Sequence, residues 1–250
     1  MPARPANLAF SGSLPHKVAL ASQAFQWGTT MVDFAQARRT MVDCQVRTSD
    51  VTDLRVIAAF LDVPRERFVP AARKAIAYLD CDVPVNDAPA PRALLKPMVL
   101  AKLLQAAAVT ATDRVLDVGC ATGYSSAVLG KLAARVVALE EDAALAATAA
   151  AALAASGAHN VAVASGKLTA GRPDEGPYDV IVLQGASEIV PEALLGQLNA
   201  GGRLLAVLGS GPLGKATIWR MAATGATPQP LFDAAAPLLP GFVKPPAFVF

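Results

Sequence analysis

The segment from Arg114 to Ser126 constrains the fold of this chain more than any other stretch. It begins with the apolar run Val115 to Val118, turns through Gly119 and Gly123, and resumes with apolar residues at helical spacing. A buried strand, a glycine turn and a helix in this order are typical of the first βα unit of an open α/β sheet. Glycines in such a turn let the backbone approach a ligand that a side chain would exclude. We therefore expect a ligand site at this turn.

The glycine spacing argues against one common ligand of such turns. A dinucleotide fingerprint needs G-x-G-x-x-G, but its second and third glycine positions here hold Ala121 and Tyr124. A nicotinamide-dependent oxidoreductase is therefore disfavoured. A plain strand, turn and helix without a ligand is the remaining alternative for this segment.

A second segment with a candidate ligand-binding residue follows the predicted helix. The run Arg135 to Glu140 predicts another strand, and Glu140 lies roughly 20 residues after the glycine turn, the separation at which a strand-end carboxylate accepts hydrogen bonds from ribose hydroxyls. The alternative is an acid that only complements the dipole of the next helix. Glu141 and Asp142 fit that second role better, so we assign Glu140 to the ligand.

The composition excludes several classes of protein. A formal charge of +2 on 250 residues gives no electrostatic footprint for nucleic acid. The three cysteines, Cys44, Cys81 and Cys120, lack C-x-x-C spacing and fit a reducing cytoplasm without a disulfide framework or zinc site. With only His16 and His159 in the chain, histidine-centred triads and metal sites are disfavoured.

The chain holds no candidate membrane span. The longest alanine-rich run, residues 143–156, is shorter than the ~20 apolar residues that a span needs. Residues 1–30 contain no sustained period and no compact apolar core of a signal peptide, so we expect a disordered extension, with a transit peptide as the alternative. We divide the rest into a helical N-terminal cap, residues 31–92, and an α/β domain, residues 93–250.

Periodicity and turn residues predict the other elements. Near Thr52, whose hydroxyl can cap, a helix begins that ends before Val63. The other expected helices cover 34–46, 63–70, 94–108, 124–132, 142–156 and 191–198, and the expected strands cover 77–85, 115–118, 135–140, 160–164, 178–184, 203–208, 216–222 and 246–250. The predicted fold class is α/β, with a doubly wound, mostly parallel sheet of the seven-stranded type, a helical cap and an antiparallel edge.

The pattern D-V-G-x-A-x-G around Asp117 resembles motif I of the class I S-adenosylmethionine-dependent methyltransferases. In that superfamily the turn cradles the methionine part of the cofactor, and the strand-end acid helps to position its amino group. The resemblance thus implies S-adenosylmethionine as cofactor and S-adenosylhomocysteine as product.

An ordered set of segments narrows the resemblance to one family. The segments "VPRERFVP", "AYLDCDVPV", "VLDVGCATGYSSAVLGKLA", "VVALEED", "PYDVIVLQGASEIVPEALLGQL" and "GGRLLAVLG" resemble the protein-L-isoaspartate O-methyltransferase family over roughly residues 42–209. The resemblance implies methyl transfer to a carboxylate on a protein or peptide, as in protein repair. The expected cofactor-binding residues are Asp117, Gly119, Cys120, Ala121, Thr122, Gly123, Tyr124, Glu140, Glu141, Gly166, Lys167 and Gln184.

Two motifs depart from the family pattern. The family's T-I-S-Q-P-like stretch corresponds to residues 93–97, where Leu95 replaces the serine, Lys96 replaces the glutamine and Pro97 is kept. The family's G-D pair corresponds to Gly166 and Lys167, and lysine is a donor without an acceptor. Residues 95–97 are therefore candidates for the substrate side, and no catalytic residue is assigned.

These departures leave three functions open. The first is transfer to a protein or peptide carboxylate, the second is transfer to a different acceptor such as a small metabolite, and the third is a module that binds the cofactor without catalysis. The sequence does not determine the oligomeric state.

Overall fold

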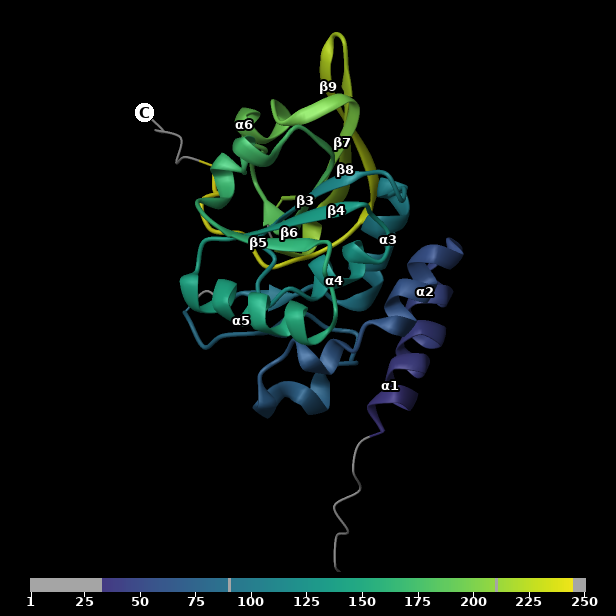
Figure 1. Cartoon of the computed structure of the whole chain (residues 1–250). Helices are drawn as coiled ribbons and strands as arrows, with labels where there is room; N and C mark the ends of the chain where they lie inside the picture. Colours follow the sequence, from purple (N-terminus) through teal and green to yellow (C-terminus); the bar gives the residue numbers. More distant parts are fainter. Residues whose placement is uncertain (1–32, 90, 210, 245–250) are drawn as a thin grey trace, which may run out of the picture. The chain divides into compact units, whose positions relative to one another are not determined.

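The computed structural model describes residues 33–89, 91–209 and 211–244 (Figure 1). The predicted extension over residues 1–30 and the predicted strand over 246–250 lie outside these residues. Seven strands form one sheet in the order β5-β4-β3-β6-β7-β8-β9. They are β3 (Arg114–Val118), β4 (Arg135–Glu140), β5 (Val161–Ser165), β6 (Tyr178–Ser187), β7 (Leu198–Leu208), β8 (Lys215–Ala222) and β9 (Gly225–Asp233). A separate antiparallel pair joins β1 (Val83–Pro84) to β2 (Ala93–Leu94).

Helices precede and alternate with the strands. The α-helices are α1 (Phe34–Met41), α2 (Leu54–Asp62), α3 (Pro97–Ala107), α4 (Tyr124–Gly130), α5 (Ala143–Ala155) and α6 (Glu192–Leu195). A π-helical turn (Val42–Val46) continues α1, and short 3₁₀ helices cover Arg47–Ser49, Arg65–Arg67, Ala71–Ile76, Leu168–Ala170, Pro173–Glu175 and Gly211–Leu213. None of the helices in the described ranges combines the length and the apolar character needed to cross a bilayer.

The strand directions identify the edge of the sheet at which a ligand is expected. Strands β5, β4, β3, β6 and β7 are parallel to one another, and β8 and β9 add an antiparallel edge whose hairpin extends beyond the other strands in Figure 1. From β3 the chain passes to β4 on one side, and β6 pairs on the other side. This is a topological switch point, where open α/β sheets bind ligands at the carboxyl ends of the strands. The predicted fold class is confirmed.

The two faces of the sheet are covered differently. Side chains alternate along each strand, so that Val115 and Val180 belong to the core under α1 to α5, whereas Leu116 and Ile181 belong to the core on the other face. On that second face the sheet meets α6, the 3₁₀ turn at Leu168–Ala170 and the C-terminal segment that carries Leu239 and Phe242. The first core also includes α1 and α2, which lie side by side in Figure 1.

Several predicted boundaries in the N-terminal half are wrong. Asp53, not Thr52, caps α2, because its Oδ1 accepts from the backbone N–H of Arg55 at 2.8 Å. Within the stretch predicted as extended, 77–85, the structure has a strand only at Val83–Pro84. The helix predicted from Leu94 begins at Pro97, since Ala93–Leu94 pair with β1.

Late in the chain, α6 is shorter and β7 longer than predicted. A second late strand, β9, lies at Gly225–Asp233, where no strand was predicted. Pro228 and Pro230 made this strand hard to predict from the sequence. An edge strand tolerates prolines, because one side of its hydrogen-bond ladder is unpaired.

Candidate active site

The glycine turn between β3 and α4 has an unusual backbone. Gly119 and Gly123 have φ values of +78° and +91°, and Ala121 adopts +53°, a left-handed conformation that costs a non-glycine residue roughly 1–2 kcal/mol. The N–H groups of Gly119 and Cys120 donate to the carbonyl of Leu139 at 2.8 and 3.1 Å. The turn is therefore fastened to the carboxyl end of β4, and the strain lies where a ligand is expected.

Asp117, at the end of β3, is fully buried and accepts three side-chain hydrogen bonds. The hydroxyls of Ser125 and Ser126 donate to Oδ2 at 2.7 and 2.5 Å, and Nε2 of Gln184 donates to Oδ1 at 2.6 Å. Burial raises the pKa of Asp117 to about 6, against the opposing effect of these donors, and the nearby charge of Glu140 adds to the rise.

Glu140, at the end of β4, is also fully buried, but it has a charged partner. Its Oε1 lies 2.8 Å from Nη1 of Arg92 and accepts from the N–H groups of Glu141 and Asp142 at 3.1 and 3.3 Å. Its Oε2 accepts from the N–H of Ala121 at 2.8 Å. The carboxylate thus joins β4, the glycine turn and the loop that carries Arg92.

Arg92 and Leu239 close the turn from outside. Nη2 of Arg92 donates to the carbonyl oxygen of Gly119 at 2.7 Å. A Cβ placed on Gly119 would lie 2.7 Å from the same Nη2 and 3.0 Å from Cδ2 of Leu239. The cavity left beside Gly119, Cys120 and Gln184 measures about 10 Å³, room for one water at most. In this conformation the turn is covered.

Two other predicted residues of the turn face the helical N-terminal region. The hydroxyl of Thr122 donates to the carbonyl of Phe68 at 2.5 Å. The ring of Tyr124 is buried between Phe60 and Phe68, and the guanidinium of Arg65 lies 4.6 Å from its centre. These contacts bind the turn to the helical N-terminal region.

Cys120 is also buried in the turn. Burial raises the pKa of the Cys120 thiol well above its usual range, so the sulfur stays protonated.

The remaining cofactor candidates lie on the rim. Glu141 is exposed, and its Oε2 accepts from the N–H of Leu168 at 3.3 Å. Gly166 follows β5 and donates its N–H to the carbonyl of Glu140 at 3.1 Å. The Lys167 side chain is exposed, immediately before the 3₁₀ turn. The structure therefore groups these three around the end of β4.

The substrate-side candidates begin α3. Leu95 is 2 % exposed, and its carbonyl accepts from Arg65 at 2.9 Å, so it is a core residue beside the small cavity. Lys96 occupies the N-cap position, and its N–H donates to Asp82 at 2.8 Å. Pro97 fills the first helical position, where a missing N–H costs nothing.

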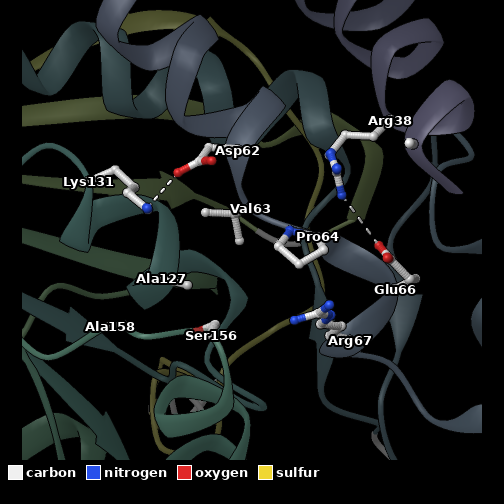
Figure 2. A pocket seen from close by; sticks show the side chains of 11 residues that line it. Arg38, Asp62, Val63, Pro64, Glu66, Arg67, Ala127, Lys131, Ser156 and Ala158 are labelled. Carbon is white, nitrogen blue, oxygen red and sulfur yellow. Dashed lines mark ion pairs between the residues drawn. The ribbon is translucent and has the colours of Figure 1, made fainter.

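A larger hollow lies elsewhere. It has a volume of about 360 Å³, and its polar lining includes the ion pairs Arg38–Glu66 and Lys131–Asp62 that Figure 2 shows. It shares no lining residue with the glycine turn or with the two buried acids. It is therefore not the ligand site that the strand ends define.

The residue types at the turn fit an adenosyl cofactor. Glu140 supplies paired acceptors for a diol, Asp117 supplies a carboxylate for an ammonium group, and Gly119 presents bare backbone. The residue types fit the cofactor, but Arg92 and Leu239 fill the space next to Gly119 in this conformation. Among the described residues, no cluster of His, Cys, Asp and Glu could hold a metal ion.

Sequence reasoning missed Arg92, Ser125, Ser126 and Leu239. The two serines stand inside the motif, eight and nine residues after Asp117, so the glycine turn and the first turn of α4 bring them back to the strand end. Arg92 carried a weaker signal, as a cation placed directly before a buried stretch.

Known proteins are similar to this chain in sequence and in fold. A family model described as Protein-L-isoaspartate(D-aspartate) O-methyltransferase matches residues 36–227. A protein-L-isoaspartate O-methyltransferase of Koribacter versatilis is 39 % identical over 180 residues, which cover 72 % of this chain and 80 % of that protein. The protein of the same name from Methanoregula boonei is 40 % identical over 182 residues, with coverage of 72 % and 82 %.

Two solved structures support the fold. One, a protein-L-isoaspartate O-methyltransferase, superposes with a TM-score of 0.73 at 23 % identity and covers 82 % of this chain and 66 % of its own. Another, a Plasmodium falciparum beta-aspartate methyltransferase in complex with S-adenosyl-L-homocysteine, has a TM-score of 0.68 at 18 % identity, with coverage of 80 % and 96 %. The match over residues 36–227 and the close relatives establish that the chain belongs to the protein-L-isoaspartate(D-aspartate) O-methyltransferase family, a family of S-adenosylmethionine-dependent methyltransferases.

Proposed function

We propose that this protein transfers a methyl group from S-adenosylmethionine to a carboxylate on a protein or peptide. One observation carries the proposal: two buried acids, Asp117 and Glu140, flank a glycine turn at the switch point of the sheet. The sequence relatives, which are named for L-isoaspartate methylation, support the same acceptor class.

Each acid has a role in this proposal. Glu140 holds the ribose hydroxyls, Asp117 holds the amino group of the methionine part, and Gly119 leaves room for the cofactor's chain. Asp117 has about four acceptor positions and receives three hydrogen bonds, so one position is left for the ammonium group. The cofactor supplies an electrophilic methyl group on a sulfonium.

The proposed reaction does not require a catalytic base from the protein. A carboxylate acceptor is ionised near neutral pH, so no general base is needed. The protein has to exclude water and hold the acceptor oxygen about 3 Å from the methyl carbon and in line with the breaking bond. Leu95 stands where the family pattern has serine, and with 2 % exposure it gives an apolar wall in place of a hydroxyl.

The test has two steps. Calorimetric titration with S-adenosylhomocysteine should give a micromolar Kd, and labelled S-adenosylmethionine should then methylate an isoaspartyl peptide but not the aspartyl peptide of the same sequence. Binding without methylation of either peptide would favour a different acceptor or a non-catalytic module. Absence of binding would contradict the proposal altogether.

A further inference from the structure

The guanidinium of Arg92 makes a forked contact inside the proposed cofactor site. Nη1 lies 2.8 Å from Oε1 of Glu140, and Nη2 lies 2.7 Å from the carbonyl oxygen of Gly119. The side chain of Arg92 is 8 % exposed and that of Glu140 is 0 % exposed. The guanidinium therefore contacts both groups on which the proposed function depends: the carboxylate of Glu140, which accepts hydrogen bonds, and the backbone of Gly119, which leaves room for the cofactor.

The carboxylate of Glu140 lacks two acceptor positions for a pair of ribose hydroxyls while Arg92 is there. A carboxylate offers about four lone-pair positions. Oε1 already receives three donors, the N–H groups of Glu141 and Asp142 and Nη1 of Arg92, whereas Oε2 receives only the N–H of Ala121 and keeps one position. Two adjacent ribose hydroxyls need two positions. The backbone donors are fixed, one in the glycine turn and two directly after β4, so Arg92 is the donor that can leave.

We infer, on the basis of the proposed function, that Arg92 occupies the position of the cofactor's ribose in the cofactor-free protein and sets the affinity for the cofactor by competing for Glu140. The cofactor's hydroxyl groups take the place of the guanidinium, and the contact to Gly119 is released with it. Arg92 is a positioning residue that opposes binding, not a ligand of the cofactor.

The structure offers the displaced guanidinium another location. A cavity of about 380 Å³ lies beside Arg92, and its lining includes Glu141, Asp142 and Asn86. The backbone of Arg92 is anchored, because its N–H donates to Oδ1 of Asn86 at 2.9 Å and its carbonyl accepts from Val85 at 2.8 Å. A rotation of the side chain alone thus carries the charge from one carboxylate towards two others.

The test is calorimetric titration of S-adenosylhomocysteine into the full chain and its variants. Arg92→Ala should bind about tenfold more tightly than wild type or better, equivalent to about 1.4 kcal/mol. Arg92→Lys should gain less, since a single ammonium keeps a charge near Glu140 but loses the fork. Arg73→Ala is the matched control, because Arg73 bonds the carbonyls of Pro84 and Asn86 in the same loop region. Its affinity should equal that of wild type.

A double-mutant cycle separates competition from a general loosening of the site. In a Glu140→Gln background the ion pair is already gone, so adding Arg92→Ala should change the affinity less than twofold. A full tenfold gain there would overturn the inference, as would an Arg92→Ala variant that binds no better than wild type. If no variant binds, the proposed function fails with it.

Discussion

Asp117 and Glu140 lie at the ends of neighbouring parallel strands, and both are completely buried, yet they are held in opposite ways. Asp117 is surrounded by neutral donors from residues close to it in sequence and from the adjacent strand β6. Glu140 is paired with a guanidinium from a loop 48 residues away. The first acid has hydrogen bonds without a compensating charge, and the second has both.

This difference explains why the two acids respond to different variables. A buried carboxylate with neutral donors still bears the desolvation cost of its charge, so its protonation changes with pH in a mildly acidic range. A buried ion pair instead depends on both partners being present, because removal of one leaves the other charge uncompensated. The site therefore has one acid sensitive to pH and one sensitive to its partner.

We expect the largest change in stability from removing the carboxylate of the Arg92–Glu140 ion pair. Glu140→Gln sets an amide N–H₂ against the buried Arg92, and we expect the free energy of unfolding to fall by about 3–5 kcal/mol. Arg92→Ala should cost less, since Glu140 keeps three backbone donors. Urea unfolding measures both. Lys131→Ala, which breaks an exposed pair with Asp62, should cost at most about 1 kcal/mol. Equal losses for all three variants would refute the distinction.

The pH dependence of stability should isolate Asp117. Its pKa is about 6 in the folded protein against 3.8 for an ordinary aspartate. Between these values the native state binds the proton more tightly than the unfolded state, so the stability that Asp117 contributes falls as the pH rises from about 4 to about 6 and is constant above that range. A difference of about two pKa units corresponds to about 3 kcal/mol.

The variant that tests this assignment is Asp117→Asn. Urea unfolding at several pH values should show wild type losing about 3 kcal/mol relative to the variant across this window. Glu140→Gln should keep a pH dependence of the same sign but smaller size, because the charge of Glu140 adds to the rise in the pKa of Asp117. Parallel curves for wild type and Asp117→Asn would show that another group titrates.

A smaller effect is expected from the local donors of Asp117. Ser126→Ala removes a 2.5 Å hydrogen bond to a carboxylate, and we expect a loss of about 1.5–3 kcal/mol at pH 7. Ser156→Ala is the control, because its hydroxyl donates to a neutral carbonyl, that of Leu153, and should cost about 0.5–1.5 kcal/mol. The loss for Ser126→Ala should also shrink as the pH falls through about 6, because Asp117 becomes neutral there. A loss independent of pH would mean that Ser126 acts through packing.

The sheet was predictable because its signals are local. The stretches Val136 to Leu139 and Val180 to Leu183 are apolar throughout, as strands buried on both faces must be, and glycines mark the turns. Where the local signal was weak, as in β9 with its two prolines, the prediction failed. The domain boundaries at residues 30 and 92 stay predictions.

The sequence by itself determined the two acids, the glycine turn and the strands that carry them, since period and spacing are encoded in short segments. Only the tertiary structure decided what those acids touch. Arg92 and Leu239 reach the turn from loops far from it in the chain, and loop conformation depends on the packing of the whole domain. Whether the cofactor site stands open or closed is therefore a property of the folded protein.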